Sequence, residues 1–221
     1  MLVTAIVANP RRNGRFSVIV DGLLAATLSL EAIERLQLSV GTVVDERLHA
    51  ALQREAMIVA TYDRALNMIA LRARSSSELR RLLIRKGEPA ELVDVAIERL
   101  VRAGFLDDAS FARQFTRSKA VGAGLSRRRV QQELARRGVA REIADVAIAE
   151  VFDEERVDES DNLERVARKK MKSLASLDAT VQRRRLYSFL ARRGYDSDDI
   201  ARTVRDVMSP ILEADAPEPL R

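Results

Sequence analysis

Residues 129–151 read "RVQQELARRGVAREIADVAIAEV" and contain the clearest helix signals of the chain. Upstream of its glycine, Gly138, apolar residues stand four and eight positions away at Leu134 and Val130, so they share one helix face. Downstream, Ile143 resumes an apolar pattern at helical spacing. Glycine just after a basic pair is typical of a helix C-terminus, where it adopts the left-handed conformation. The stretch therefore predicts two helices joined by a short turn.

The same pattern occurs twice more. "ELRRLLIRKGEPAELVDVAIERL" (78–100) has its glycine at Gly87, and "RLYSFLARRGYDSDDIARTVRDV" (185–207) has its glycine at Gly194, with one more residue in the turn. A further helical segment precedes each pair, over residues 62–74, 108–120 and 161–172. Self-similarity at this period indicates a repeat protein. We therefore predict a mainly α chain with three tandem three-helix repeats.

The first 60 residues carry strand signals instead. β-branched runs are separated by Asn13-Gly14 and Asp21-Gly22, which are typical of hairpin turns. Strands are therefore expected over residues 2–9, 15–20 and 23–28. Ser29 then precedes a short amphipathic helix and can cap it. This predicts a small β-rich module of three strands plus one helix.

These patterns divide the chain into five segments. A helix is expected to end before Pro210, and the acidic, Pro-containing stretch that follows is expected to be disordered. The segments are the N-terminal β-rich module (1–60), the first repeat (61–106), the second repeat (107–155), the third repeat (156–209) and a disordered tail (210–221).

The joint between the first two repeats reads "RAGFLDDASFARQF". We expect Gly104 to end one helix and Phe105 and Leu106 to fill the core. Asp107 or Asp108 would then cap the next helix, because a carboxylate accepts hydrogen bonds from the free N–H groups there. A catalytic acid or a metal ligand is the alternative, but no third carboxylate stands at ligand spacing.

Composition excludes several classes of chemistry. There is no cysteine and a single histidine, His49, so thiolate sites, disulfides and histidine-based triads are not expected. No phosphate-binding Gly-x-x-x-x-Gly-Lys-Ser/Thr loop occurs. We predict a non-enzyme with no catalytic, cofactor-binding or metal-binding residues. Without an 18-residue apolar run or a signal peptide, we also expect a cytoplasmic protein with no membrane contact.

The charge is uneven along the chain. The chain has 38 basic and 33 acidic residues. Positions 1–62 hold six basic and six acidic residues, and positions 210–221 hold one basic and three acidic residues. The middle of the chain therefore holds 31 basic and 24 acidic residues, a net charge of +7. Such an excess favours polyanions or acidic protein surfaces as partners.

The repeats resemble the RecX family, regulators of the RecA recombinase. The resemblance lies in "RSSSELRRLLIRKG", in "VDVAIERLVRAGFLDDASFARQF", in "GLSRRRVQQELARRGV" and in "FLARRGYDSDDIARTV". It covers about residues 60–208 and includes the Gly-x-Leu-Asp-Asp-x-x-Phe-Ala joint from Gly104 to Ala112. The N-terminal module resembles the strand-rich extension of some members.

The resemblance implies an elongated, curved array of repeats that binds along the RecA–DNA filament as a monomer. It implies an inhibitor that limits ATP turnover, strand exchange and filament growth, and so regulates DNA repair, recombination and the SOS response. DNA contacts would be independent of sequence, and no cofactor is implied.

Basic clusters recur before each glycine and are the candidate filament- and DNA-binding residues. Cations in the last turn of a helix also complement its dipole, so the pairs next to each glycine have a structural alternative. Arginines that open a middle helix do not have this alternative. The candidates are Arg80, Arg81, Arg85, Lys86, Arg127, Arg128, Arg129, Arg136, Arg137, Lys169, Lys170, Lys172, Arg183, Arg184, Arg185, Arg192 and Arg193.

Other interpretations stay open. Two short helices joined at a glycine also suit a helix-turn-helix DNA-binding transcription regulator, and a helical scaffold without a nucleic-acid role is a third possibility. Tyr187, Phe189 and Tyr195 could stack on bases, although Phe189 has core spacing. The acidic run at 153–161 suits a solvated linker or a competitor of nucleic acid for the basic surface.

Overall fold

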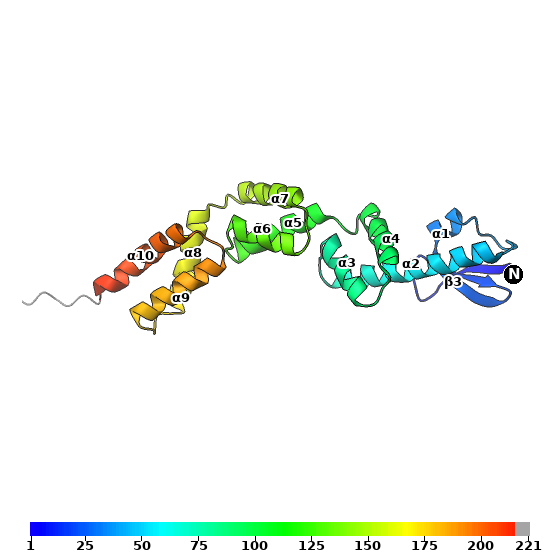
Figure 1. The fold of residues 1–221 in the computed structure, drawn as a ribbon, viewed down its shortest axis with the longest axis horizontal. Helices are drawn as coiled ribbons and strands as arrows, with labels where there is room; N and C mark the ends of the chain where they lie inside the picture. Colours follow the sequence, from blue (N-terminus) through cyan, green and yellow to red (C-terminus); the bar gives the residue numbers. More distant parts are fainter. Residues whose placement is uncertain (215–221) are drawn as a thin grey trace, which may run out of the picture. The chain divides into compact units, whose positions relative to one another are not determined.

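The structure is a computed structural model that describes residues 1–214. A three-stranded sheet is followed by helices (Figure 1), and the chain divides into two compact units, Met1–Asp107 and a second that begins at Asp108. The mainly α class, the small N-terminal sheet and the three-helix repeats are confirmed. The elongated, curved arrangement of the repeats stays a prediction.

The N-terminal sheet is an antiparallel meander in the order β1-β2-β3. Its strands are β1 (Val3–Ala8), β2 (Arg15–Val20) and β3 (Leu23–Ser29). Asp21 and Gly22 join β2 to β3, and both have positive φ, +48° and +82°. A two-residue turn of this kind matches the twist of the strands, as the sequence predicts.

One face of the sheet packs on helices. Helix α1 (Leu30–Arg35) follows β3, and helix α2 (Glu46–Leu71) lies against it. Val18, Leu28 and Leu52 are fully buried members of one cluster that joins the sheet to both helices. Successive side chains of a strand point to opposite faces of the sheet, so every second residue of each strand can face the helices, and these residues are mostly apolar.

The first repeat shares its first helix with the β-rich module. Helix α2 passes without a break through position 60/61, where the sequence places the boundary between the two. Its later turns pack with α3 (Ser76–Arg85) and α4 (Ala90–Arg102). The turn between these helices is closed at Gly87, whose φ is +91°, because Glu88 N–H donates to the Leu83 carbonyl at 3.1 Å.

A buried carboxylate fixes α2 to its neighbours. Glu55, in the middle of α2, is 4% exposed. Arg99 of α4 donates to both of its oxygens, at 2.5 and 3.0 Å, and Arg35 of α1 donates to one of them. A buried charge is tolerated only when it is paired and hydrogen-bonded. Glu55 therefore joins the β-rich module to the first repeat.

The second repeat begins with an irregular helix. Helix α5 (Asp108–Thr116) continues as the π-helical segment η1 (Arg117–Gly122), and α6 (Arg127–Arg136) and α7 (Arg141–Glu154) complete the unit. The helix predicted over 108–120 is therefore present, but its last turn is widened. Ser126 caps α6, because its Oγ accepts from Arg129 N–H at 3.2 Å.

At the joint, the prediction for Phe105 is wrong. Leu106 is 3% exposed and belongs to the core of the first repeat, whereas Phe105 is 55% exposed. Both N–H groups donate to the Leu100 carbonyl, at 2.9 and 3.3 Å, which closes the turn and points only Leu106 inward. Helix α5 begins at Asp108, so Asp107 stands directly before it. Its role as the cap stays a prediction.

The third repeat comprises α8 (Glu159–Lys172), α9 (Ala179–Arg192) and α10 (Ser197–Ala214). Helix α10 continues past Pro210, where the sequence predicted its end. Proline removes one backbone hydrogen bond but does not by itself stop a helix. The part of the predicted tail after Ala214 lies outside the described residues.

The acidic run contains the short connection between α7 and α8, and most of its residues are exposed, as the solvated-linker interpretation expects, but its two ends are helical. Its first residues end α7, and its last residues form the first turn of α8. Asp158 caps α8 by accepting from Ser160 N–H at 2.7 Å and from Asp161 N–H at 3.0 Å. Carboxylates are favourable at this end of a helix because the unpaired N–H groups are partly positive.

Candidate nucleic-acid interface

The predicted basic residues separate into two groups by exposure. Thirteen are exposed: Arg80, Arg81, Arg85, Lys86, Arg127, Arg128, Arg136, Lys169, Lys172, Arg183, Arg184, Arg185 and Arg192. Four are partly buried: Arg129, Arg137, Lys170 and Arg193. Only the first group presents most of its charge to a large partner.

The partly buried cations have structural contacts. The Arg193 guanidinium lies 3.9 Å from the centre of the Phe189 ring, and Arg137 lies 4.7 Å from that of Phe115. Burial, aided by repulsion from Arg192, lowers the pKa of Arg193. In the second and third repeats, the second member of the pair before the glycine thus packs inward on an aromatic ring.

The two arginine triplets differ in their setting. Arg127 is the first residue of α6, as the sequence predicts, but α9 begins at Ala179, so Arg183 lies in its second turn rather than at its start. Within the first triplet, Arg129 forms an ion pair with Glu133 at 3.3 Å along the helix. The second triplet is exposed throughout.

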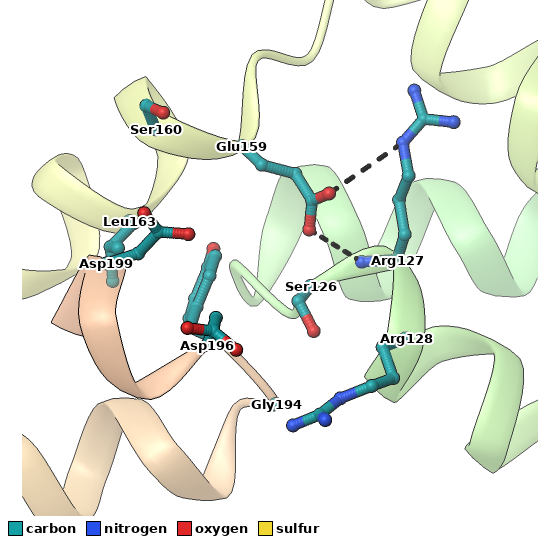
Figure 2. Close-up of a pocket in the computed structure, with 10 residues that line it drawn as sticks. Ser126, Arg127, Arg128, Glu159, Ser160, Leu163, Gly194, Asp196 and Asp199 are labelled. Carbon is teal, nitrogen blue, oxygen red and sulfur yellow. Dashed lines mark hydrogen bonds and ion pairs between the residues drawn. The ribbon is translucent and has the colours of Figure 1, made fainter.

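Arg127 is also engaged in the fold. Its guanidinium lies 4.1 Å from the centre of the Phe152 ring, and its Nε lies 3.9 Å from a Glu159 oxygen. The Arg127 N–H donates to the other oxygen of that carboxylate at 2.9 Å (Figure 2). Arg128 is exposed on the opposite side of the helix start. Of the three neighbours, Arg128 is the one whose charge is best placed for a partner.

Between the second and third repeats lies a hollow of about 290 Å³ (Figure 2). Its charged lining consists of Arg127, Arg128, Glu159, Asp196 and Asp199. Three carboxylates against two guanidinium groups give it no positive excess. The hollow is therefore a poor site for a phosphate group.

The hollow marks a tightly bonded contact between these repeats. Tyr195 O–H donates to the Gly124 carbonyl at 3.2 Å, and Asn162 Nδ2 donates to the Ala120 carbonyl at 3.1 Å. The Ser126 N–H donates to the Arg193 carbonyl at 3.1 Å. The Tyr195 bond gives a partner to the Gly124 carbonyl in the turn after η1, and the Arg193 bond gives one to the buried Ser126 N–H. The Ala120 carbonyl also accepts from Gly124 N–H at 3.1 Å.

Close packing adds to these bonds. A Cβ atom on Gly194 would lie 2.5 Å from Arg129 Cβ and 2.7 Å from Ser126 Oγ. A Cβ atom on Gly124 would lie 2.3 Å from Val166 Cγ1. Glycine is thus required at both positions for lack of space as well as for its positive φ. The sequence indicates the turn at Gly194 but not this contact.

Tyr195 gives this contact a pH dependence. Burial raises its pKa to about 12, from an ordinary value near 10. The folded state keeps the phenol protonated where the unfolded state ionises, so we expect stability to fall as pH rises from about 10 to about 12. Tyr195→Phe should remove part of this fall and cost about 1 kcal/mol at neutral pH through the lost hydrogen bond.

Urea denaturation across pH 8–12 checks this expectation. Tyr187→Phe is the control, because it removes the same hydroxyl from a tyrosine that is 38% exposed and does not line the hollow. Equal alkaline profiles for the parent and Tyr195→Phe would contradict the assigned role of Tyr195.

Charge is segregated between the helices of each repeat. Every exposed charged residue of the middle helices α3, α6 and α9 is an arginine. The last helices show the reverse: α4 exposes three acids and one arginine, and α7 exposes five acids and one arginine. In the part of α10 whose side chains are described, three acids and two arginines are exposed. The basic surface is therefore a property of the middle helices.

The aromatic candidates do not form a stacking platform. Tyr195 is 6% exposed, and Phe189 lies against the core of the third repeat beneath two cations. Tyr187 alone is exposed. Among residues 1–214 there is no group of three metal-binding side chains, and no helix is long and apolar enough to cross a membrane.

The fold and its surface define a tandem-repeat helical protein with cationic middle helices. Three domain descriptions match it: the first three-helix domain of RecX at residues 62–100, the second at 107–148 and the third at 158–204. The chain belongs to the RecX family of regulatory proteins.

Relatives and solved structures agree. The regulatory protein RecX of Pelodictyon phaeoclathratiforme is 34% identical over 156 residues, 69% of this chain and 92% of that protein. The RecX of Levilactobacillus brevis is 27% identical over 90% of this chain and 73% of its own length. A crystal structure of regulatory protein RecX shares the fold with a TM-score of 0.72, at 20% identity, over 93% of this chain and 98% of that one.

Proposed function

We propose that this chain modulates the RecA recombinase by binding the RecA–DNA filament. Bound there as a monomer in the cytoplasm, it limits ATP turnover, strand exchange and filament growth without catalysing a reaction itself. The observation that supports the proposal is the arginine-only exposed charge of α3, α6 and α9, repeated in all three units. A repeated cationic surface suits a partner that is itself a repeating polyanion.

The thirteen exposed cations are the proposed contact residues. Two of them, Lys169 and Lys172, lie on α8 rather than on a middle helix. They meet DNA phosphates, acidic recombinase surface, or both. Arg80 is held in place by Asp94, at 2.6 and 3.1 Å, and this hydrogen-bonded pairing raises the pKa of Arg80.

The helix-turn-helix alternative fits the structure less well. In such regulators the second helix of the pair enters the major groove. Here the second helices are α4, α7 and α10, and their exposed charges are mostly carboxylates, which DNA phosphates repel. Sequence-specific reading by these helices is therefore unfavourable.

Co-sedimentation tests the proposal. The chain is mixed with RecA–DNA filaments, with RecA alone and with naked DNA, and ATP hydrolysis is followed in parallel. We expect the strongest binding to filaments, a dose-dependent fall in RecA ATP turnover, and no hydrolysis by the chain alone. Unchanged turnover at stoichiometric amounts would contradict the proposal, and a footprint at one defined duplex sequence would favour the transcription regulator.

A further inference from the structure

A second basic site lies between the β1–β2 loop of the N-terminal module and α2, the helix that this module shares with the first repeat. The loop from Asn9 to Gly14 joins β1 to β2, and together with α2 it lines a hollow of about 400 Å³. Four arginines and one carboxylate line this hollow, and one of the arginines, Arg64, forms an ion pair with Glu88 outside it. The charged residues are Arg11, Arg12, Arg15, Arg64 and Asp63. Positions 1–64 hold seven basic and seven acidic residues, so the arginines of the hollow are a local concentration of positive charge.

The loop that carries two of these arginines is held in one conformation. Asn9 N–H donates to the Arg15 carbonyl at 2.7 Å, and Arg15 N–H donates to the Arg12 carbonyl at 3.1 Å. The Asn9 side chain accepts from Arg11 N–H at 3.0 Å, and Gly14 supplies the positive φ of +69° that the turn requires. Less conformational freedom is therefore lost when a ligand binds.

The floor of the hollow is an ion pair with α2. Arg15, whose side chain is 15% exposed, donates to Asp63 through Nε at 3.1 Å and lies over the Tyr62 ring at 5.5 Å. Arg12 Nη1 lies 3.7 Å from the same carboxylate, yet its side chain is 56% exposed. Asp63 thus offsets the innermost arginine and leaves Arg11 and Arg12 at the rim.

The lining favours phosphate oxygens over a peptide. Beside the arginines stand Asn13 and Asn67, whose amide groups add hydrogen-bond donors, and the apolar lining is limited to Ala60 and Leu66. Protein partners usually gain affinity by burying aromatic or large apolar side chains. Guanidinium and amide donors match the non-bridging oxygens of a phosphodiester.

We propose that the β1–β2 loop and α2 form a second binding site for the phosphodiester backbone of nucleic acid, contacted by Arg11 and Arg12. The site is independent of base sequence, because its donors reach phosphates rather than base edges. The proposal rests on the proposed function and deepens it, since the N-terminal module would contact DNA through its own arginines in addition to the contacts made by the middle helices.

The test is the double variant Arg11→Gln and Arg12→Gln of the full chain. Binding to a labelled mixed-sequence oligonucleotide, without RecA, is measured over a salt series. We expect weaker binding, and a slope of log affinity against log salt that shrinks by about 1.4 for a single strand or about 1.8 for a duplex, the value for two lost contacts. Both side chains are exposed, so the thermal melt should match that of the parent.

The matched control is Arg47→Gln with Arg54→Gln. It removes the same charge from exposed positions of the same unit, on α2 but outside the hollow. Equal affinities and slopes for the two double variants would overturn the proposal. So would a loop variant that binds DNA as the parent does but loses binding to RecA alone, because the hollow would then hold acidic protein.

The two proposals fail in different ways. The oligonucleotide assay contains no recombinase, so its outcome does not depend on the proposed regulation of RecA. Conversely, loss of RecA regulation after changes in α9, with the loop intact, says nothing against the phosphodiester site.

Discussion

Replacing Glu55 with alanine is expected to destabilise the N-terminal unit by about 3–5 kcal/mol, the usual cost of removing one partner from a buried ion pair. The carboxylate is 4% exposed and holds Arg99, whose side chain is 16% exposed. Hydrogen bonding to Glu55 is the main reason that the pKa of Arg99 is raised. Without Glu55 this guanidinium would be left charged and poorly solvated.

Urea unfolding measures the effect. Because the chain has two compact units, two transitions are possible, and the change should affect the one that belongs to Met1–Asp107. Glu98→Ala is the control: Glu98 pairs with Arg102 one turn away on α4, and both side chains are about two-thirds exposed. That pair should contribute less than about 0.5 kcal/mol.

A double variant separates the ion pair from simple packing. Glu55→Met with Arg99→Met replaces the charges by apolar groups of similar length. We expect it to be more stable than Glu55→Ala, since no buried charge is left without its partner. Equal stability of the parent and Glu55→Ala would show that the carboxylate does not hold the module to the repeat.

The second large effect is expected on α9. Changing Arg183, Arg184 and Arg185 to Gln removes three exposed charges from one middle helix while keeping helix propensity and most of the side-chain length. Inhibition of RecA-mediated strand exchange should weaken markedly. If all three contact phosphates, the salt slope of filament binding should also shrink by about 2.1–2.7.

Its control removes the same charge from the same unit: Arg141→Gln, Arg168→Gln and Arg202→Gln. Each of these arginines pairs with an acid on its own helix, and none lies on a middle helix. Circular dichroism should show that both triple variants are folded. If they inhibit the recombinase equally well, net charge rather than the middle-helix surface governs binding.

Much of the fold could be predicted because its signals are local. Hairpin turns such as Asp21-Gly22, the Ser29 cap and the glycine helix ends depend on neighbouring residues, and the structure has them where the sequence places them. Phe105 shows the limit. Two adjacent apolar residues gave no sign of which one faces the core, because that depends on how the turn closes on Leu100.

The candidate surface was harder to predict, because a run of cations does not reveal its partners. Arg127, Arg128 and Arg129 look alike in sequence, yet the first lies on Phe152 and the last pairs with Glu133. The segregation of charge between middle and last helices is visible in sequence once the repeats are aligned. By contrast, the partners of Glu55 lie 20 and 44 residues away, and no local pattern indicates them.

The hydrogen bond from Tyr195 to Gly124 has a consequence for biosynthesis. The two residues are 71 positions apart, so at about 5–20 residues per second the ribosome adds the tyrosine roughly 4–14 s after the glycine. In the later part of that interval, once residue 155 has been added, the second repeat is complete in sequence, but the Gly124 carbonyl still lacks its hydrogen bond from Tyr195. A nascent chain arrested before α9 would expose this backbone group to chaperones and proteases, whereas the finished chain hides it.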